Sequence, residues 1–261
     1  MNDNAILSEV RGHVGLLTVN RPKVHNSLST PVLLELEQAF IELENNPEVR
    51  VIVFTGAGDK AFVAGGDLSE MASRDGISHY QEFAEDIHRV FRRFEVSDKP
   101  TIAAVNGYAL GGGTELLLSL DIRLLADNAS LALPEIGLGV FPGAGGTQRM
   151  IRQVPACVAR ELMFSGRRFD AEEAVRIGLA NRVLPQVDLL DEAVAMAAKI
   201  ADKSPLVLKL MKRALRDGAD MPMAAALAHE QAMIGLVFDT QDAHEGMTAF
   251  LEKRKPSFTG R

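Results

Sequence analysis

The order of short β-branched runs and helical stretches is the feature that most constrains the fold. Up to about residue 185, apolar runs typical of buried strands alternate with amphipathic stretches typical of helices. Helical patterning covers residues 30–43, with Thr30 as N-cap and Pro31 as first helical residue, and residues 77–95. This alternation favours an α/β architecture of stacked βαβ units. The runs that predict strands are Val14–Asn20, Arg50–Gly56, Thr101–Asn106 and Asp121–Ala126.

Strand signals end near residue 187, and the rest of the chain is predicted to be helical. The patterning predicts helices at Asp188–Ala201, Ser204–Asp217 and Pro222–Lys253, with Ser204 and Pro205 starting the second one. An all-helical tail with substantial apolar content suggests an element that packs across a subunit boundary or closes over a site. We therefore divide the chain into an α/β core at residues 1–187 and a helical region at residues 188–261.

Composition and the lengths of the apolar runs indicate an ordinary soluble globular chain. Apolar residues make up 47% of its 261 residues and charged residues 24%. No apolar run approaches the roughly 18–20 residues that cross a bilayer, and the N-terminal residues do not read as a secretory signal. The single cysteine, Cys157, allows no internal disulfide and is expected to be a buried structural thiol. We therefore expect a cytoplasmic protein.

Charge weighs against a nucleic-acid partner. The net charge is −7 with a pI near 5.4, and the only dense basic cluster is Lys253–Lys255. None of the six histidines forms a paired-ligand pattern, so no metal site is expected. An anionic ligand would have to be held by local basic groups and by backbone N–H donors.

A glycine-rich turn follows the predicted strand at residues 50–56. Gly65 and Gly66 stand directly before a helical stretch, within Asp59-Lys-Ala-Phe-Val-Ala-Gly-Gly-Asp-Leu68. Glycines let the backbone approach a ligand closely and can turn successive N–H groups in one direction. The alternative is an ordinary strand-to-helix turn in which Asp67 caps the next helix. The residues alone leave both interpretations open.

Three consecutive glycines, Gly111–Gly113, stand where a predicted strand passes into an apolar helix beginning near Thr114. The N–H groups at a helix N-terminus suit an oxyanion that forms during a reaction. Neither P-loop nor Rossmann spacing is present. Glu115, in the first turn, either compensates the helix dipole or is a partly buried carboxyl that exchanges protons near neutral pH.

A second carboxyl, Glu135, lies in an apolar and glycine-rich stretch. Pro134 biases Leu133 toward an extended conformation, and Glu135 follows at a turn beside Ile136. A solvated loop glutamate is the usual explanation for such a position. The apolar surroundings weigh against it, because a free carboxylate there is costly unless it has a task.

Four motifs in this order resemble the enoyl-CoA hydratases of the crotonase superfamily. They are Ala61-Phe-Val-Ala-Gly-Gly-Asp-Leu68, Gly107-Tyr-Ala-Leu-Gly-Gly-Gly-Thr-Glu-Leu116, Leu133-Pro-Glu-Ile-Gly-Leu138 and Pro142-Gly-Ala-Gly-Gly-Thr-Gln-Arg149. The resemblance runs from the turn at residues 20–23 to the tail at residues 252–256. It implies a spiral of ββα turns followed by a helical trimerisation region, with trimers commonly paired into hexamers.

The resemblance also implies an acyl-CoA substrate and roles for particular residues. The backbone N–H groups of Ala64 and Gly112 would hold the thioester oxygen, while Glu115 would activate water and Glu135 would protonate the α-carbon. Basic groups of the tail would meet the phosphates. No metal, flavin or nicotinamide is implied, since coenzyme A is part of the substrate. The implied substrate-binding residues are Lys23, Val24, Ala64, Gly65, Gly66, Asp67 and Gly112.

The sequence departs from the family pattern at three positions. Gly66, Thr114 and Leu133 stand where alanine, cysteine and glutamine are common, and Leu133 removes a polar group beside Glu135.

Two rival functions are open. An enoyl-CoA isomerase can manage with one carboxyl, so the presence of both glutamates favours hydration. A noncatalytic acyl-CoA-binding or RNA-binding homologue would be favoured by a missing glutamate or a basic helix, and the sequence has neither feature.

Overall fold

The computed structural model describes residues 4–261 and contains two β-sheets. The larger sheet has six strands in the order β1-β2-β3-β5-β7-β10, and the smaller has four in the order β4-β6-β8-β9. The larger sheet comprises β1 (Ile6–Arg11), β2 (Val14–Val19), β3 (Val51–Gly56), β5 (Thr101–Val105), β7 (Ile122–Ala126) and β10 (Arg182–Leu184). The smaller comprises β4 (Ala61–Val63), β6 (Tyr108–Leu110), β8 (Ser130–Ala132) and β9 (Phe169–Asp170).

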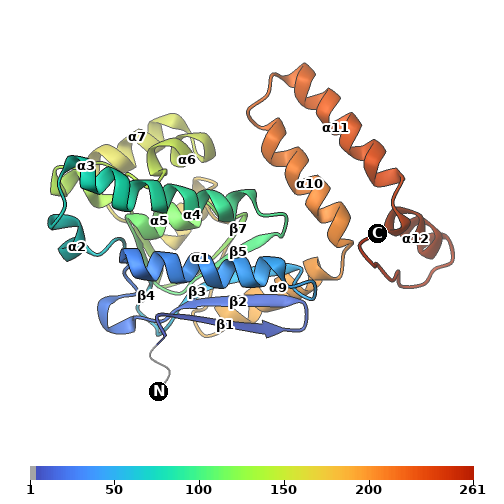
Figure 1. Cartoon of the computed structure of the whole chain (residues 1–261), viewed down its shortest axis with the longest axis horizontal. Coiled ribbons are helices and arrows are strands. Elements are labelled where there is room, and N and C mark those ends of the chain that lie inside the picture. Colours follow the sequence, from blue (N-terminus) through green and yellow to red (C-terminus); the bar gives the residue numbers. More distant parts are fainter. Residues whose placement is uncertain (1–3) are drawn as a thin grey trace.

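Helices connect and cover these sheets (Figure 1). The core contains α1 (Thr30–Asn45), α2 (Leu68–Ala72), α3 (Gly76–His79), α4 (Glu85–Val96), α5 (Gly112–Leu118), α6 (Gly146–Gln153), α7 (Ala156–Ser165), α8 (Ala171–Arg176) and α9 (Leu189–Ala201). The tail contains α10 (Pro205–Gly218), α11 (Met223–Phe238) and α12 (Gln241–Leu251). Single turns of 3₁₀ helix occur at η1 (Pro22–Val24) and η3 (Pro134–Leu138), and a π-helical turn at η2 (Tyr80–Ala84).

The chain moves between the two sheets in a repeating pattern. Strands β3, β5 and β7 lie side by side in the larger sheet, and each is followed by a strand of the smaller sheet, β4, β6 and β8. These neighbours pair in parallel, and helices return the chain after each pair. The repeated strand–strand–helix unit is the predicted ββα spiral.

The central strand β3 is buried on both faces, as its uninterrupted apolar sequence predicts. On one face Phe54 packs against Phe40 of α1 and Phe94 of α4, with ring centroids 5.9 and 5.1 Å away. On the other face Val53 belongs to the cluster formed with Ala197 of α9. Helix α9 therefore packs on the sheet, although it lies in the region predicted to be a helical appendage. The division of the chain at residue 187 stays a prediction.

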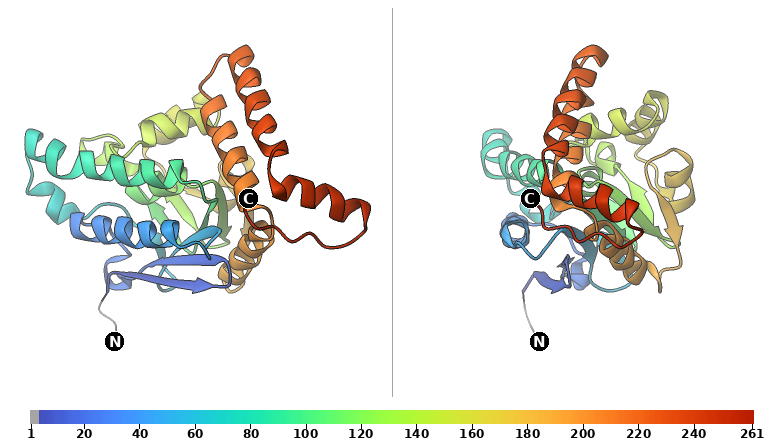
Figure 2. Two further views of the ribbon diagram at one scale, coloured as in Figure 1. Left: turned by 45° about the vertical axis from the view of Figure 1, so that its right-hand side comes forward. Right: turned by 90° about the vertical axis from the view of Figure 1, so that its right-hand side faces the viewer.

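Helices α10 to α12 project away from the spiral, as Figure 1 and the left view of Figure 2 show. Helix α10 is joined to the core by ion pairs, with Lys212 Nζ 2.6 Å from Asp121 Oδ2 and Arg213 Nε 2.7 Å from Asp98 Oδ1. None of the helices in the described chain is long and apolar enough to cross a bilayer.

The helical stretch predicted at residues 77–95 is confirmed, since α3, the π-turn η2 and α4 follow one another there. Two local predictions were wrong. The helix predicted at residues 222–253 is two helices, because α11 ends at Phe238 and Thr240 Oγ1 accepts a hydrogen bond from Ala243 N to cap α12. Cys157 is exposed, because it lies in the first turn of α7 on the face turned away from Ala159 and Leu162, which are buried.

Candidate active site

The two glycine segments come together beside the start of α5. Leu28 forms a parallel bridge with Gly66, which holds residues 65–67 against the chain before α1. A Cβ atom built on Gly112 would lie 3.6 Å from the Gly66 nitrogen, so the two backbones are in contact there. Across the same region, a Cβ on Gly113 would lie only 1.8 Å from the Val63 carbonyl oxygen. Only glycine fits at residue 113 in this arrangement.

The backbone N–H groups of Gly66 and Gly112 belong to this contact, and neither has an acceptor among the hydrogen bonds of residues 4–261. The sequence analysis assigned the first donor to Ala64. The Ala64 N–H group instead donates to the His25 carbonyl oxygen at 3.0 Å, so it is already paired. Because the bridge with Leu28 uses the N–H group of Asp67, the Gly66 N–H points to the other side of the strand, where Gly112 lies.

Gly111 shapes the entry to α5. Its φ of +52° and ψ of −119° are outside the regions open to residues with a side chain. A Cβ there would also lie 2.8 Å from Glu135 Oε1, so the Glu135 carboxyl packs directly on this backbone. The turn therefore places the Glu135 carboxyl next to the first N–H groups of α5.

Glu115 is buried in the first turn of α5, with 2% of its surface exposed. Its Oε1 accepts hydrogen bonds from the backbone N–H groups of Ala144 and Gly146, each at 2.7 Å. The pKa of Glu115 is raised to about 7, because burial and the nearby Glu135 carboxyl, which raise it, outweigh the two N–H donors and Arg149, which lower it. A carboxyl with this pKa can exchange protons at neutral pH.

Glu135 lies in η3, the turn before α6, and faces the same region. Its Oε2 is buried and has no hydrogen-bond partner in the described part of the chain. Burial raises the pKa of this carboxyl as well. Two neighbouring carboxyls with raised pKa values can divide the roles of acid and base between them.

Ala144 and Gly146, which hold Glu115, received no role from the sequence. The signal for them is present in Gly143-Ala-Gly-Gly146, a segment rich in small residues whose N–H groups can converge on one oxygen. A Cβ on Gly146 would lie 2.9 Å from Glu115 Oε1, so the close approach itself requires glycine.

The two segments predicted to line the coenzyme A path are adjacent. The hydrogen bond from Ala64 N to His25 O links the strip at residues 64–67 to η1, where Lys23 and Val24 are exposed. Asp67 caps α2, since its side chain accepts hydrogen bonds from Ser69 N and Glu70 N. Helix capping is the alternative that the sequence analysis left open for Asp67. A role of Asp67 in substrate binding stays a prediction.

Part of the basic tail is paired within the chain. The Arg254 guanidinium donates to both carboxylate oxygens of Glu245, at 2.6 and 2.8 Å, and Lys255 Nζ lies 3.1 Å from Asp202 Oδ2. A cavity of 640 Å³ lies elsewhere, between β1, β2 and the start of α9, and neither glutamate lines it. Because the paired N–H donors and carboxyls are at the start of α5, we place the reaction there.

Comparison with known proteins identifies the family of the chain. Residues 9–261 match the family model described as enoyl-CoA hydratase/isomerase, and the chain belongs to this family. It is 44% identical to a short-chain-enoyl-CoA hydratase of Clostridium acetobutylicum, with 98% of this chain and 97% of the relative covered. It is 42% identical to a crotonyl-CoA hydratase of Syntrophomonas wolfei, with 98% of both chains covered.

The fold is also shared with solved structures. An enoyl-CoA hydratase from Bacillus anthracis superposes with a TM-score of 0.95 at 39% identity, covering 99% of this chain and all of the other. The predicted family and the predicted crotonase-like α/β spiral are therefore confirmed. The roles of the individual residues are not tested by these comparisons.

Proposed function

We propose that the chain is an enoyl-CoA hydratase, a carbon–oxygen lyase that adds water reversibly across the 2,3 double bond of a 2-enoyl-CoA to give a 3-hydroxyacyl-CoA. The observation that carries this proposal is the convergence of Glu115 and Glu135 on the backbone where Gly66 and Gly112 have unpaired N–H groups. The family and the names of its relatives support the same reaction.

The Gly66 and Gly112 N–H groups bind the thioester carbonyl oxygen in this mechanism. Attack of water on C3 moves the electrons of the double bond toward C2 and the carbonyl, so negative charge develops on that oxygen. Two N–H donors stabilise this charge, and loss of one such donor typically costs about 10²–10³ in rate. Gly66 replaces Ala64 in this role because the Ala64 N–H is used by His25.

Glu115 activates the water. Its Oε1 is held by two N–H donors, which leaves Oε2 to accept a proton from water as the new C3–O bond forms. Glu135 is the acid, and its carboxyl delivers a proton to C2 as the enolate-like charge collapses. The two carboxyls then return to their starting protonation states by exchange with solvent. No cofactor takes part in this scheme.

The tail supports self-association as a trimer or a hexamer formed by two trimers. Helix α11 has no buried residue, although its sequence is strongly apolar. Five of its large apolar side chains are 48–73% exposed in the single chain, namely Met223, Leu227, Ile234, Leu236 and Phe238. Met223, Leu227, Ile234 and Phe238 recur at helical spacing and share one face of α11, and an exposed apolar face of this kind marks an association surface. A cytoplasmic location, expected from the sequence, and a place in fatty acid β-oxidation, suggested by the family, both stay predictions.

Turnover of a panel of 2-enoyl-CoA esters with different acyl groups tests the proposed function. Hydration is followed by the loss of absorbance of the conjugated thioester. We expect at least one short-chain ester to be hydrated by the purified wild-type protein, and no hydration of any ester would contradict the proposal.

A further inference from the structure

The loop that holds Glu115 is itself held by Arg149 of α6. Arg149 Nη1 donates to the Ala144 carbonyl oxygen at 3.0 Å, while the Ala144 N–H group donates to Glu115 Oε1 at 2.7 Å. Both polar groups of Ala144 are therefore engaged, one by the arginine and one by the glutamate. This arrangement fixes the direction in which the Ala144 N–H group points.

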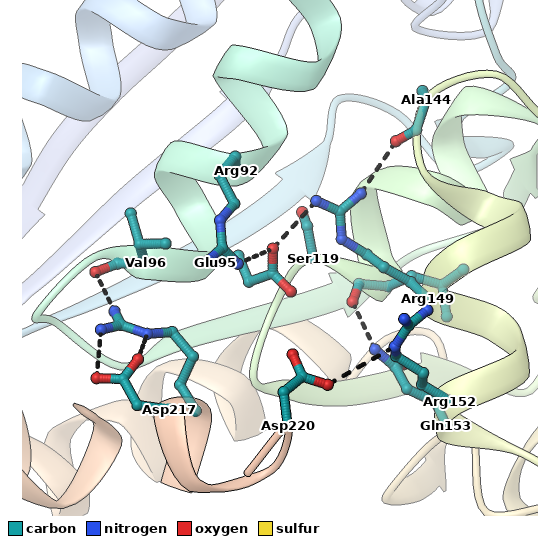
Figure 3. Close-up of polar contacts among 12 residues, drawn as sticks. Arg92, Glu95, Val96, Ser119, Ala144, Arg149, Arg152, Gln153, Asp217 and Asp220 are labelled. Carbon is teal, nitrogen blue, oxygen red and sulfur yellow. Dashed lines mark hydrogen bonds and ion pairs between the residues drawn. The ribbon is translucent and has the colours of Figure 1, made fainter. Parts of the chain in front are cut away.

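The guanidinium of Arg149 is anchored on its other side by α4. Nη2 donates to Glu95 Oε2 at 3.1 Å, and Arg92 Nη1 donates to the same oxygen at 2.9 Å (Figure 3). Only 12% of the Arg149 side chain is exposed. A Cβ on Gly145 would lie 2.0 Å from Nη1, so the guanidinium packs directly against the backbone of the loop. Because the guanidinium is bonded to Ala144 on one side and to Glu95 on the other, it restricts movement of the loop that holds Glu115.

Arg149 is also the one cation whose charge contributes to the pKa of Glu115 in the described structure. Helix α5 packs against β4, β6 and α6. Strand β4 has no ionisable residue, and β6 has only Tyr108, which is exposed. On α6 the other arginine, Arg152, is directed toward Asp220 at 3.8 Å. Glu135 in η3 is the remaining charged group that acts on Glu115, and it raises the pKa of Glu115 whereas Arg149 lowers it.

We propose that Arg149 is a positioning residue for hydration, which holds Ala144 so that the loop orients Glu115 toward water. The positive charge of Arg149 also favours the ionised form of that carboxyl. This inference rests on the proposed function, because it assigns Glu115 the role of base. Arg149 acts through Ala144 and does not contact the substrate in this scheme. Its loss should therefore lower kcat and leave KM nearly unchanged.

Arg149→Met tests the inference, with Arg152→Met as its matched control on the same helix. In Arg149→Met we expect kcat to fall about 10- to 100-fold, since small misplacement of a catalytic group has effects of this size. Without the cation, Glu115 accepts a proton more readily, so the acid limb of the kcat–pH profile should move to higher pH. Arg152→Met should leave kcat and the acid limb at their wild-type values.

Arg149→Lys separates orientation from charge and serves where Arg149→Met does not fold. Lysine keeps the positive charge but cannot bind Ala144 and Glu95 with a planar fork. We expect a fall in kcat of about tenfold with the acid limb near its wild-type position. A wild-type kcat in Arg149→Lys, a wild-type acid limb in folded Arg149→Met, or an equal shift in Arg152→Met would each overturn the inference. Wild-type protein that hydrates no enoyl-CoA would instead refute the proposed function.

Discussion

The N–H group of Gly146 lies 2.7 Å from Oε1 of Glu115, and the space beside this hydrogen bond does not admit a side chain. A Cβ on residue 146 would lie 2.9 Å from that oxygen and 2.9 Å from the Cβ of Pro142. Contacts of this length force the loop or the glutamate to move. The orientation of the proposed base therefore depends on a glycine 31 residues away in the sequence.

Gly146→Ala should lower kcat for hydration by about tenfold or more, because the added methyl group displaces the Glu115 carboxyl. Gly76→Ala is the matched control, since a Cβ there meets no atom within 4 Å. Steady-state kinetics on both variants check this prediction. A Gly146→Ala protein with wild-type kcat would show that the loop adjusts without disturbing the base.

Glu115→Gln and Glu135→Gln should each lower hydration at least about a hundredfold, because general acid or base catalysis supplies about 10²–10⁴ in rate. Both changes preserve the size of the side chain, so the fold should remain intact. Glu192→Gln, at an exposed position on α9, is the control. Near-normal hydration by either active-site variant, with an unchanged circular dichroism spectrum, would remove that residue from the mechanism.

Glu115 should make the stability of the fold depend on pH. Its pKa rises from 4.5 to about 7 on folding, so the native state binds more protons than the unfolded state between these values. Stability should therefore fall as pH rises through this window and level off above it, with a total cost on the order of 3 kcal/mol. Glu115→Gln has no ionisable carboxyl at this position, so its free energy of unfolding should not include this cost.

Urea denaturation at pH 5 and pH 8 measures the effect. The gain in stability of Glu115→Gln over the wild type should be larger at pH 8 than at pH 5. Glu192→Gln should show no such difference. An equal gain at both pH values would mean that the Glu115 carboxyl is not protonated preferentially in the native state.

The spiral could be predicted because its strands and glycine turns each leave a local signal. Buried β3 is an unbroken apolar run, and the glycines at residues 111–113 mark the junction of strand and helix. Both glutamates stood out for the same reason, as carboxyls in apolar surroundings. The local sequence pattern was sufficient to predict the structure of segments whose conformation depends mainly on their own residues.

The features that were missed depend on contacts between distant segments. The N–H group of Ala64 is unsuitable as an oxyanion donor because it pairs with His25, 39 positions earlier, and no local pattern reveals that pairing. The exposure of Cys157 depends on which face of α7 packs on the core. Arg149 received no role from the sequence, because its partners Glu95 and Ala144 are brought together only by folding.

The exposed face of α11 predicts a specific association. Static light scattering should give the mass of a trimer or hexamer at micromolar concentration, and a monomer mass would contradict the proposed assembly. Leu227→Asp should shift the population to smaller species, because it places a charge on the exposed apolar face of α11. Glu192→Gln, at an exposed position on α9, should leave the mass unchanged.

Isotope incorporation during turnover tests the central claim most directly. Wild-type protein and 2-butenoyl-CoA are incubated in H₂¹⁸O, and the product is analysed by mass spectrometry. The account predicts a 3-hydroxyacyl-CoA with ¹⁸O on C3, formed by the wild type and Glu192→Gln, and at least about a hundredfold slower by Glu115→Gln. Loss of the conjugated substrate without ¹⁸O on C3, or equal incorporation by Glu115→Gln, would contradict hydration by this pair of glutamates.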